Sequence, residues 1–173
     1  PDTYTNNNGK SDIIASREFR EGVKWDQENR WPIAYPTVDI AIFSADRTEI
    51  LLGRKEHESK FRFFGGYFER GHGSYEGCAT KEVQEEAGIE CTSMEYVGST
   101  IIDDDRYANS RDGIVTILFQ TQYQFGHPKA GDDIHEVRWF KLPIISETDL
   151  VRAHHPLWQM LAEFNNIPTQ HGS

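Results

Sequence analysis

The chain has 173 residues, of which 37% are apolar and 12% aromatic, a composition that supports a folded domain and excludes a disordered chain. Its 18 basic and 28 acidic residues give a net charge of −10, which argues against a general nucleic-acid binder because neutralising phosphates needs a basic surface. Two cysteines exclude a disulfide framework, and no apolar run is long enough to span a bilayer. We therefore expect a cytoplasmic protein with no nucleic-acid or membrane partner.

The N-terminal part of the chain, residues 1–31, is expected to be a polar tail followed by a short helix or strand that docks on the main body. Its Trp25 and Trp31 are candidates for an N-terminal lid or a dimer contact. Pro32 and Pro36 end this extension, since proline restricts its own backbone and that of the preceding residue. The domain proper is expected over residues 32–166, with a second tail at 167–173. Its first half is predicted to contain strands at 37–43, 49–55 and 61–64.

The second half begins with a predicted helix that Ser74 can cap and that ends near Ala87, where Gly88 can adopt a left-handed conformation. Two strands of an antiparallel pair are expected next, at 94–102 and 113–125, joined by a charged linker. A strand at 136–142 and a final helix over about 147–165 complete the domain. This mixture of strands with helices at intervals predicts a mixed α/β or α+β sandwich.

Three carboxylates occupy one face of the predicted central helix. Glu82, Glu85 and Glu86 stand at positions i, i+3 and i+4, which lie together on a helix surface. Carboxylate oxygens are the ligands that Mg²⁺ and Mn²⁺ prefer. A glycine-dense segment, residues 65–73, precedes the helix and lets the backbone approach another group closely. The pattern fits a metal–diphosphate site, and a solvated acidic helix after a flexible loop is the alternative.

The segment 65–89 resembles the signature of the Nudix hydrolases. Gly66 matches the opening glycine, and the closing half is matched at Glu82, Val83, Glu85, Glu86, Gly88 and Ile89. The sequence departs from the signature in three respects: Lys81 replaces an arginine, the spacing is one residue longer, and His72 or Gly73 stands where the first glutamate belongs. The resemblance implies an α/β/α sandwich with a mixed sheet that hydrolyses a nucleoside diphosphate linked to another moiety.

The resemblance also implies roles for individual residues. Mg²⁺, or Mn²⁺, would be held by the metal ligands Glu82, Glu85, Glu86 and Gly66. Catalysis is expected from Glu86 and Glu85, with a general base or further ligand among Asp132, Asp133 and Glu136, of which Glu136 is preferred. Candidate substrate contacts are Arg54, Arg62, Arg70, Tyr107 and Asp133, because guanidinium groups pair with phosphate oxygens and an aromatic ring can stack on a base.

The substrate class expected from the resemblance is a nucleoside diphosphate sugar, with ADP-ribose among the candidates. The expected assembly is a homodimer. The alternative function is a non-catalytic domain of the same fold that senses a nucleotide metabolite, which the altered glutamate position and Lys81 favour. The three helix glutamates favour the enzyme.

Overall fold

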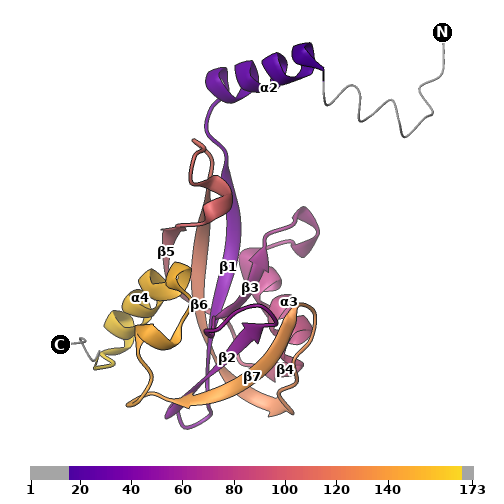
Figure 1. Ribbon diagram of the computed structural model, residues 1–173. Coiled ribbons are helices and arrows are strands. Elements are labelled where there is room, and N and C mark those ends of the chain that lie inside the picture. Colours follow the sequence, from indigo (N-terminus) through magenta and orange to yellow (C-terminus); the bar gives the residue numbers. More distant parts are fainter. Residues whose placement is uncertain (1–15, 169–173) are drawn as a thin grey trace.

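The computed structural model describes residues 16–168, which form a curled mixed sheet with a helix against each face (Figure 1). The strands of this part of the chain are β1 (Ala34–Phe43), β2 (Glu49–Lys55), β3 (Phe64–Tyr67), β4 (Ile89–Cys91), β5 (Glu95–Ile102), β6 (Gly113–Gly126) and β7 (Ile134–Lys141). β1 and β6 run parallel in the middle, and all the other pairings are antiparallel. The expected α/β sandwich with a mixed sheet is confirmed.

Strand β1 is central because it is apolar on both of its faces. Val38, Ile40 and Ile42 pack into one core, whereas Ala41 and Phe43 pack into the other. Side chains of a strand alternate between faces, so a continuous apolar run can only be buried when both faces are covered. The two helices provide that cover.

Helix α3 (Tyr75–Ala87) covers one face and α4 (His155–Asn165) covers the other (Figure 1). The Ser74 side chain accepts a hydrogen bond from the backbone N–H of Gly77, and Gly88 ends α3 with φ of 65°. Both ends of this helix are therefore as predicted. Short 3-10 turns lie at η1 (Arg70–His72), η2 (Asp105–Tyr107), η3 (Glu147–Asp149) and η4 (Arg152–His154).

Two sequence predictions need correction. Strand β3 is shifted along the chain so that it includes Gly65 and Gly66, which pair with Asp39 and Val38 of β1. The expected helix over 147–165 is interrupted, and its regular part begins only at His155. The interruption arises because the backbone on either side of Leu150 hydrogen-bonds to Phe61 instead of continuing a helix.

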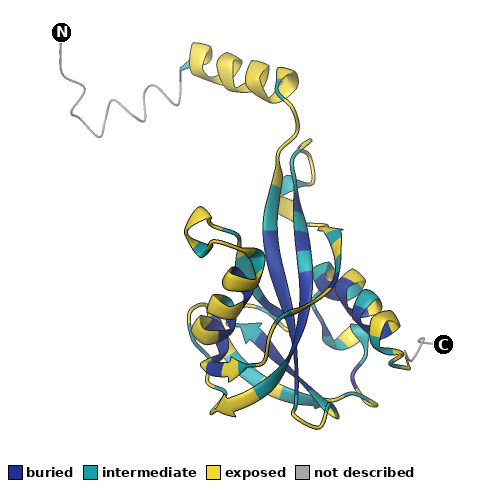
Figure 2. Ribbon diagram, turned by 180° about the vertical axis from the view of Figure 1, so that it is seen from behind, coloured by how far each residue is buried: buried dark blue, intermediate teal, exposed yellow. Residues whose placement is uncertain are grey.

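The N-terminal extension also differs from expectation. Helix α2 (Arg17–Asn29) has no buried residue and projects away from the sheet, so the prediction that it docks on the body is wrong (Figures 1 and 2). It is tied to the domain at its base, where Arg30 forms an ion pair with Asp112 at 2.6 Å. Residues 1–15 and 169–173, which include most of the predicted C-terminal tail at 167–173, lie outside the described residues.

Candidate active site

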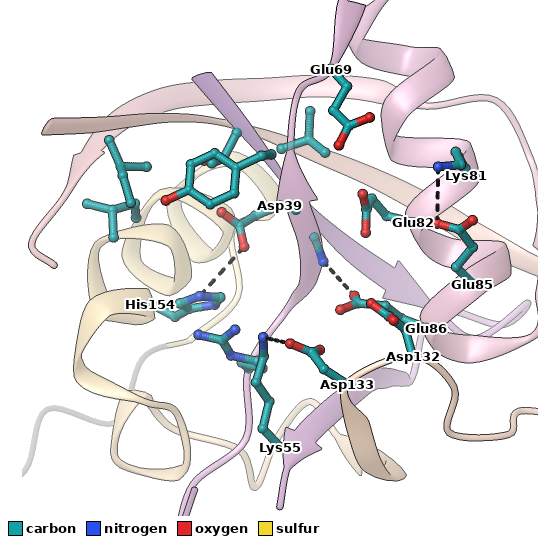
Figure 3. Close-up of a pocket in the computed structure, with 18 of the residues that line it drawn as sticks. Asp39, Lys55, Glu69, Lys81, Glu82, Glu85, Glu86, Asp132, Asp133 and His154 are labelled. Carbon is teal, nitrogen blue, oxygen red and sulfur yellow. Dashed lines mark hydrogen bonds and ion pairs between the residues drawn. The ribbon is translucent and has the colours of Figure 1, made fainter. Parts of the chain in front are cut away.

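A cavity of about 490 Å³ opens beside β3, between the side of α3, the loop before β7 and the turn η4. One wall carries carboxylates from α3 and from the loop, and basic side chains line the space facing them (Figure 3). Residues of β1 and β3 line the space between these walls. The cavity therefore joins parts of the chain that are more than a hundred residues apart.

Glu86 is the most deeply buried of the three predicted helix glutamates, with 2% of its surface exposed. The backbone N–H of Gly65 donates a hydrogen bond to its Oε2 at 2.8 Å. Burial raises the pKa of Glu86 to about 8, and the nearby charges of Glu82 and Asp133 act in the same direction. A buried carboxylate among other carboxylates calls for a cation to neutralise it.

Glu82 lies against the backbone of β3. A Cβ atom on Gly66 would lie 2.6 Å from Glu82 Oε1, so a larger residue at this position would force the Glu82 carboxylate to move. Burial raises the pKa of Glu82, with a further contribution from Glu85. Glu85 lines the more open edge of the cavity, where it forms an ion pair with Lys81 at 3.4 Å.

The loop between β6 and β7 brings two further carboxylates to the helix. Lys129 and Gly131 donate backbone hydrogen bonds to the carbonyls of Ala87 and Glu86, and so satisfy the end of α3. This contact places Asp132 and Asp133 beside Glu86. One carboxylate oxygen from each of these three residues lies within 4.8 Å of the others.

This donor set fits a hard divalent cation. The cluster of Glu86, Asp132 and Asp133, with Glu82 lining the same cavity, offers only carboxylate oxygens, which Mg²⁺ and Mn²⁺ prefer. Asp133 is predicted both as a substrate contact and as a possible base or further ligand, and its carboxylate lies in this cluster. Asp132 holds a left-handed backbone conformation with φ of 49°, which turns the loop at this point.

Only one of the cationic residues at the cavity is among those predicted from the sequence. Of the three predicted arginines only Arg62 lines the cavity, together with Lys55, Lys81 and Arg106. Lys55 forms an ion pair with Asp133. Lys55 faces the site and Arg54 does not, because consecutive side chains of β2 point to opposite faces of the sheet.

The structure does not bring the other predicted site residues to the cavity. Glu136 is paired with Arg54, at 2.5 Å, and with Arg138, and these hydrogen bonds lower its pKa. Arg70 is exposed on η1 and does not line the cavity. Tyr107 packs against Tyr35, with 5.2 Å between ring centroids. The tyrosine that lines the cavity is Tyr67.

A buried polar pair lines the cavity away from the carboxylates. Asp39 of β1 and His154 of η4 are 7% and 5% exposed. No periodicity or spacing in the sequence marks either one as a site residue, because they are 115 positions apart. Their proximity depends on the interruption of the C-terminal helix at η4.

An acidic cluster built around the buried Glu86, in a cavity that is also lined by lysine and arginine, could hold a divalent cation and a phosphate group. The chain belongs to the Nudix hydrolase family, because the NUDIX domain model matches residues 35–163. None of the helices between residues 16 and 168 has the length and apolar character that a bilayer crossing requires.

Comparisons with individual proteins agree with this family. The chain is 28% identical over 118 residues to the NAD-capped RNA hydrolase NudC of Pseudomonas aeruginosa; the match covers 66% of this chain and 38% of the relative. The chain thus spans well under half of these curated relatives.

Solved structures share the fold. The Nudix domain of Shewanella oneidensis NrtR, crystallised with ADP ribose, superposes with a TM-score of 0.62 at 16% identity, covering 86% of this chain and 98% of that one. A UDP-X diphosphatase superposes with a TM-score of 0.63 at 14% identity, covering 90% of this chain and 76% of that one. A MutT/nudix family protein from Enterococcus faecalis superposes with a TM-score of 0.51 at 21% identity, covering 80% of this chain and 57% of that one.

Proposed function

We propose that this protein hydrolyses the diphosphate bond of a nucleoside diphosphate linked to another moiety, with nucleotide sugars such as ADP-ribose as the first class to test. The observation that carries the proposal is the position of Glu86, buried among carboxylates and facing a cavity lined with lysine and arginine. An anionic substrate enters such an acidic site only if a cation offsets the repulsion.

The residues that would hold Mg²⁺ are Glu82, Glu86, Asp132 and Asp133. When bound, the ion would supply charge neutralisation at the phosphoryl oxygens and a lowered pKa for water. Lys55 and Arg62 bind the remaining phosphate oxygens and orient the diphosphate. The positive charges of Lys55 and Arg62 also offset the electrostatic repulsion between the diphosphate and the carboxylates of the cavity wall.

Glu85 is the residue we assign as general base in place of Glu136. Its carboxylate lies at the open edge of the cavity, where it can pass a proton to solvent. Water attacks one phosphorus, a new P–O bond forms, the P–O–P bond breaks, and Glu85 accepts the proton that the water loses. The sequence-based preference for Glu136 has no support from its position, because it is engaged by two arginines outside the cavity.

The proposal is tested by measuring release of AMP from ADP-ribose with and without Mg²⁺. Glu86→Gln should lower kcat/KM on the order of a hundredfold and abolish the thermal shift that Mg²⁺ produces. Glu85→Gln should lower kcat but keep that thermal shift. The matched control is Glu76→Gln, a change on the exposed first turn of the same helix, which should leave both measurements unchanged.

A sensor without catalysis is the second candidate, and one observation favours it. His72 lines the cavity, and either it or Gly73 stands where the family signature has a glutamate. A sensor would bind ADP-ribose with Mg²⁺ and release no product from any nucleotide sugar. Turnover that depends on Glu86 would exclude it.

A further inference from the structure

The buried pair of Asp39 and His154 has hydrogen-bonding capacity that the protein itself does not use. The two side chains line the same cavity as the carboxylates, on the other side of β3 (Figure 3). His154 Nε2 and Asp39 Oδ1 are 3.6 Å apart, which is longer than a hydrogen bond. Buried polar groups are nearly always satisfied, so a pair left open toward a cavity points to a ligand.

The protonation of His154 follows from its partners. The backbone N–H of Phe63 donates to His154 Nδ1 at 3.1 Å, so Nδ1 is an acceptor and the neutral ring carries its proton on Nε2. Burial lowers the pKa of His154, which keeps the ring neutral. The ring also stacks on Phe63 with 5.7 Å between centroids, so its orientation is fixed.

Asp39 is held in a similar way. Its Oδ2 accepts a hydrogen bond from the Thr116 hydroxyl at 2.6 Å, which leaves Oδ1 as the oxygen nearest His154. The cavity therefore presents one N–H donor and one carboxyl oxygen side by side. A group that both accepts and donates a hydrogen bond satisfies the two together, and a hydroxyl is the simplest such group.

We propose that Asp39 and His154 form a specificity subsite for a sugar hydroxyl of the substrate, which accepts from His154 Nε2–H and donates to Asp39 Oδ1. The geometry is consistent with this. A hydroxyl oxygen about 2.8 Å from each atom would subtend about 80° between partners 3.6 Å apart. The inference rests on the proposed function, since it concerns the moiety attached to the same diphosphate.

The subsite is close enough to the phosphate-binding residues to act on one ligand. The positive charge of Lys55 lowers the pKa of both Glu86 and His154. The charge of Arg62 lowers the pKa of both Asp39 and His154. A diphosphate bound by Lys55 and Arg62 thus lies next to the pair. The hydroxyl then belongs to a sugar directly attached to the diphosphate, either the nucleoside ribose or the terminal sugar.

The test uses non-hydrolysable ligands, so that binding is measured apart from turnover. The reference ligand is ADP-ribose with a methylene group in place of the bridging oxygen, titrated by calorimetry in the presence of Mg²⁺. One comparison ligand replaces the terminal ribose by a methyl ester, and a second keeps that ribose but lacks both hydroxyls of the nucleoside ribose. The wild-type protein should bind one of these two at least about tenfold more weakly, and which one identifies the sugar.

The variants Asp39→Asn and His154→Asn should abolish that discrimination. In Asp39→Asn the Thr116 hydroxyl keeps the new amide oxygen as its acceptor, so the amide NH₂ faces His154 and no acceptor is left for the ligand. In His154→Asn the new amide oxygen can accept from the Phe63 N–H, but no donor remains at the position of Nε2. Each variant should bind the reference and comparison ligands within about threefold of each other.

The control variant is His155→Gln, which changes the neighbouring histidine. His155 is hydrogen-bonded to the carbonyl of Leu150 and does not line the cavity. It should keep the wild-type discrimination. A purely structural role for the pair would lower the melting temperature of the variants but leave the discrimination intact, and would overturn the inference. Equal binding of all three ligands by the wild type would also overturn it.

Failure of the proposed function gives a different result. In that case neither AMP release nor binding of the reference ligand is detected, and both proposals fall together. Turnover of ADP-ribose without discrimination at the subsite overturns the inference alone.

Discussion

Gly66 sets the distance between the backbone of β3 and the carboxylate of Glu82. A methyl group in Gly66→Ala would lie 2.6 Å from Glu82 Oε1 and would displace that carboxylate from its place beside the cluster. We expect a loss of turnover on the order of tenfold or more and a weaker Mg²⁺ dependence, with a melting temperature that changes little because Glu82 has room to move into the cavity. Steady-state kinetics over a Mg²⁺ series would measure the effect.

Gly71 provides the matched control for this prediction. A Cβ atom there meets no atom within 4 Å, although the residue belongs to the same glycine-dense segment. Gly71→Ala should therefore keep wild-type activity. Equal loss of activity in both variants would mean that the flexibility of the segment, and not contact with Glu82, is what matters.

The titration of Glu86 makes the metal-free protein sensitive to pH. Its pKa is about 8 in the folded protein against an ordinary value of 4.5, so between these values the folded state binds more protons than the unfolded state. Stability must then fall as pH rises through this window. Asp39, with a pKa of about 7, acts in the same direction. The depressed pKa of His154 acts in the opposite direction, and only below about pH 6.5.

Between pH 6.5 and 8 we therefore expect the unfolding free energy of the metal-free protein to decrease by about 2 kcal/mol through Glu86. Urea unfolding at several pH values in EDTA measures this slope. Glu86→Gln should flatten it and Glu76→Gln should not. Saturating Mg²⁺ should reverse it, because metal binding favours the ionised carboxylates. A slope that is the same in all three proteins would contradict this account.

At the scale of elements, the junction between α3 and the loop before β7 determines whether the acidic cluster forms. Gly131 lies so close to the helix end that an added Cβ would be 2.3 Å from the carbonyl oxygen of Glu85. Gly131→Ala should therefore displace Asp132 and Asp133 from Glu86. We expect Mg²⁺ affinity to fall by about tenfold or more, measured by calorimetry, since these carboxylates lie in the cluster.

Gly113→Ala is the comparison for this variant, because a Cβ atom at that strand start meets nothing within 4 Å. It should bind Mg²⁺ as the wild type does. Unchanged Mg²⁺ affinity in Gly131→Ala would show that the loop carboxylates do not belong to the metal site.

The elements that were predictable are those whose signals are local. Ser74, the helix glutamates and Gly88 follow each other along the chain, and α3 begins and ends where capping chemistry requires. The C-terminal helix was misjudged because its interruption comes from pairing with Phe61, nearly ninety positions away. Long-range pairing of this kind leaves no trace in local periodicity.

The candidate site shows the same division between residues marked by local spacing and residues placed by long-range pairing. The three glutamates could be named from spacing alone, and they do line one cavity. Glu136 could not be judged, since its role depends on the register that sets it opposite Arg54. Lys55 could have been preferred over Arg54 only with knowledge of which face of β2 meets the site.

At the scale of the whole molecule, α2 is separable from the domain. The helix buries none of its residues, and the domain contact at its base runs through Arg30, whose guanidinium lowers the pKa of Asp112. Removing residues 1–27 should leave the melting temperature within about 2 °C and turnover unchanged. Calorimetric melting and kinetics of the shortened chain test this.

The exposed apolar residues Phe19, Val23 and Trp25 make the same deletion informative about assembly. The homodimer remains a prediction, and sedimentation velocity of the full and shortened chains would show whether this helix contributes to it. A large drop in melting temperature on deletion would contradict the separability of α2 and would mean that the helix packs against another surface in solution.

The late position of η4 and α4 in the sequence has a consequence for biosynthesis. The carboxylates of the cluster are all translated by residue 133. His154 and three α4 residues that cover one face of the sheet are translated later: Leu157, Trp158 and Leu161. A ribosome-bound chain can thus bring the proposed metal ligands together while that apolar face is still open to solvent. At this stage the chain exposes apolar strand surface that is prone to aggregate, and the proposed sugar subsite forms only once η4 and α4 have packed on the sheet.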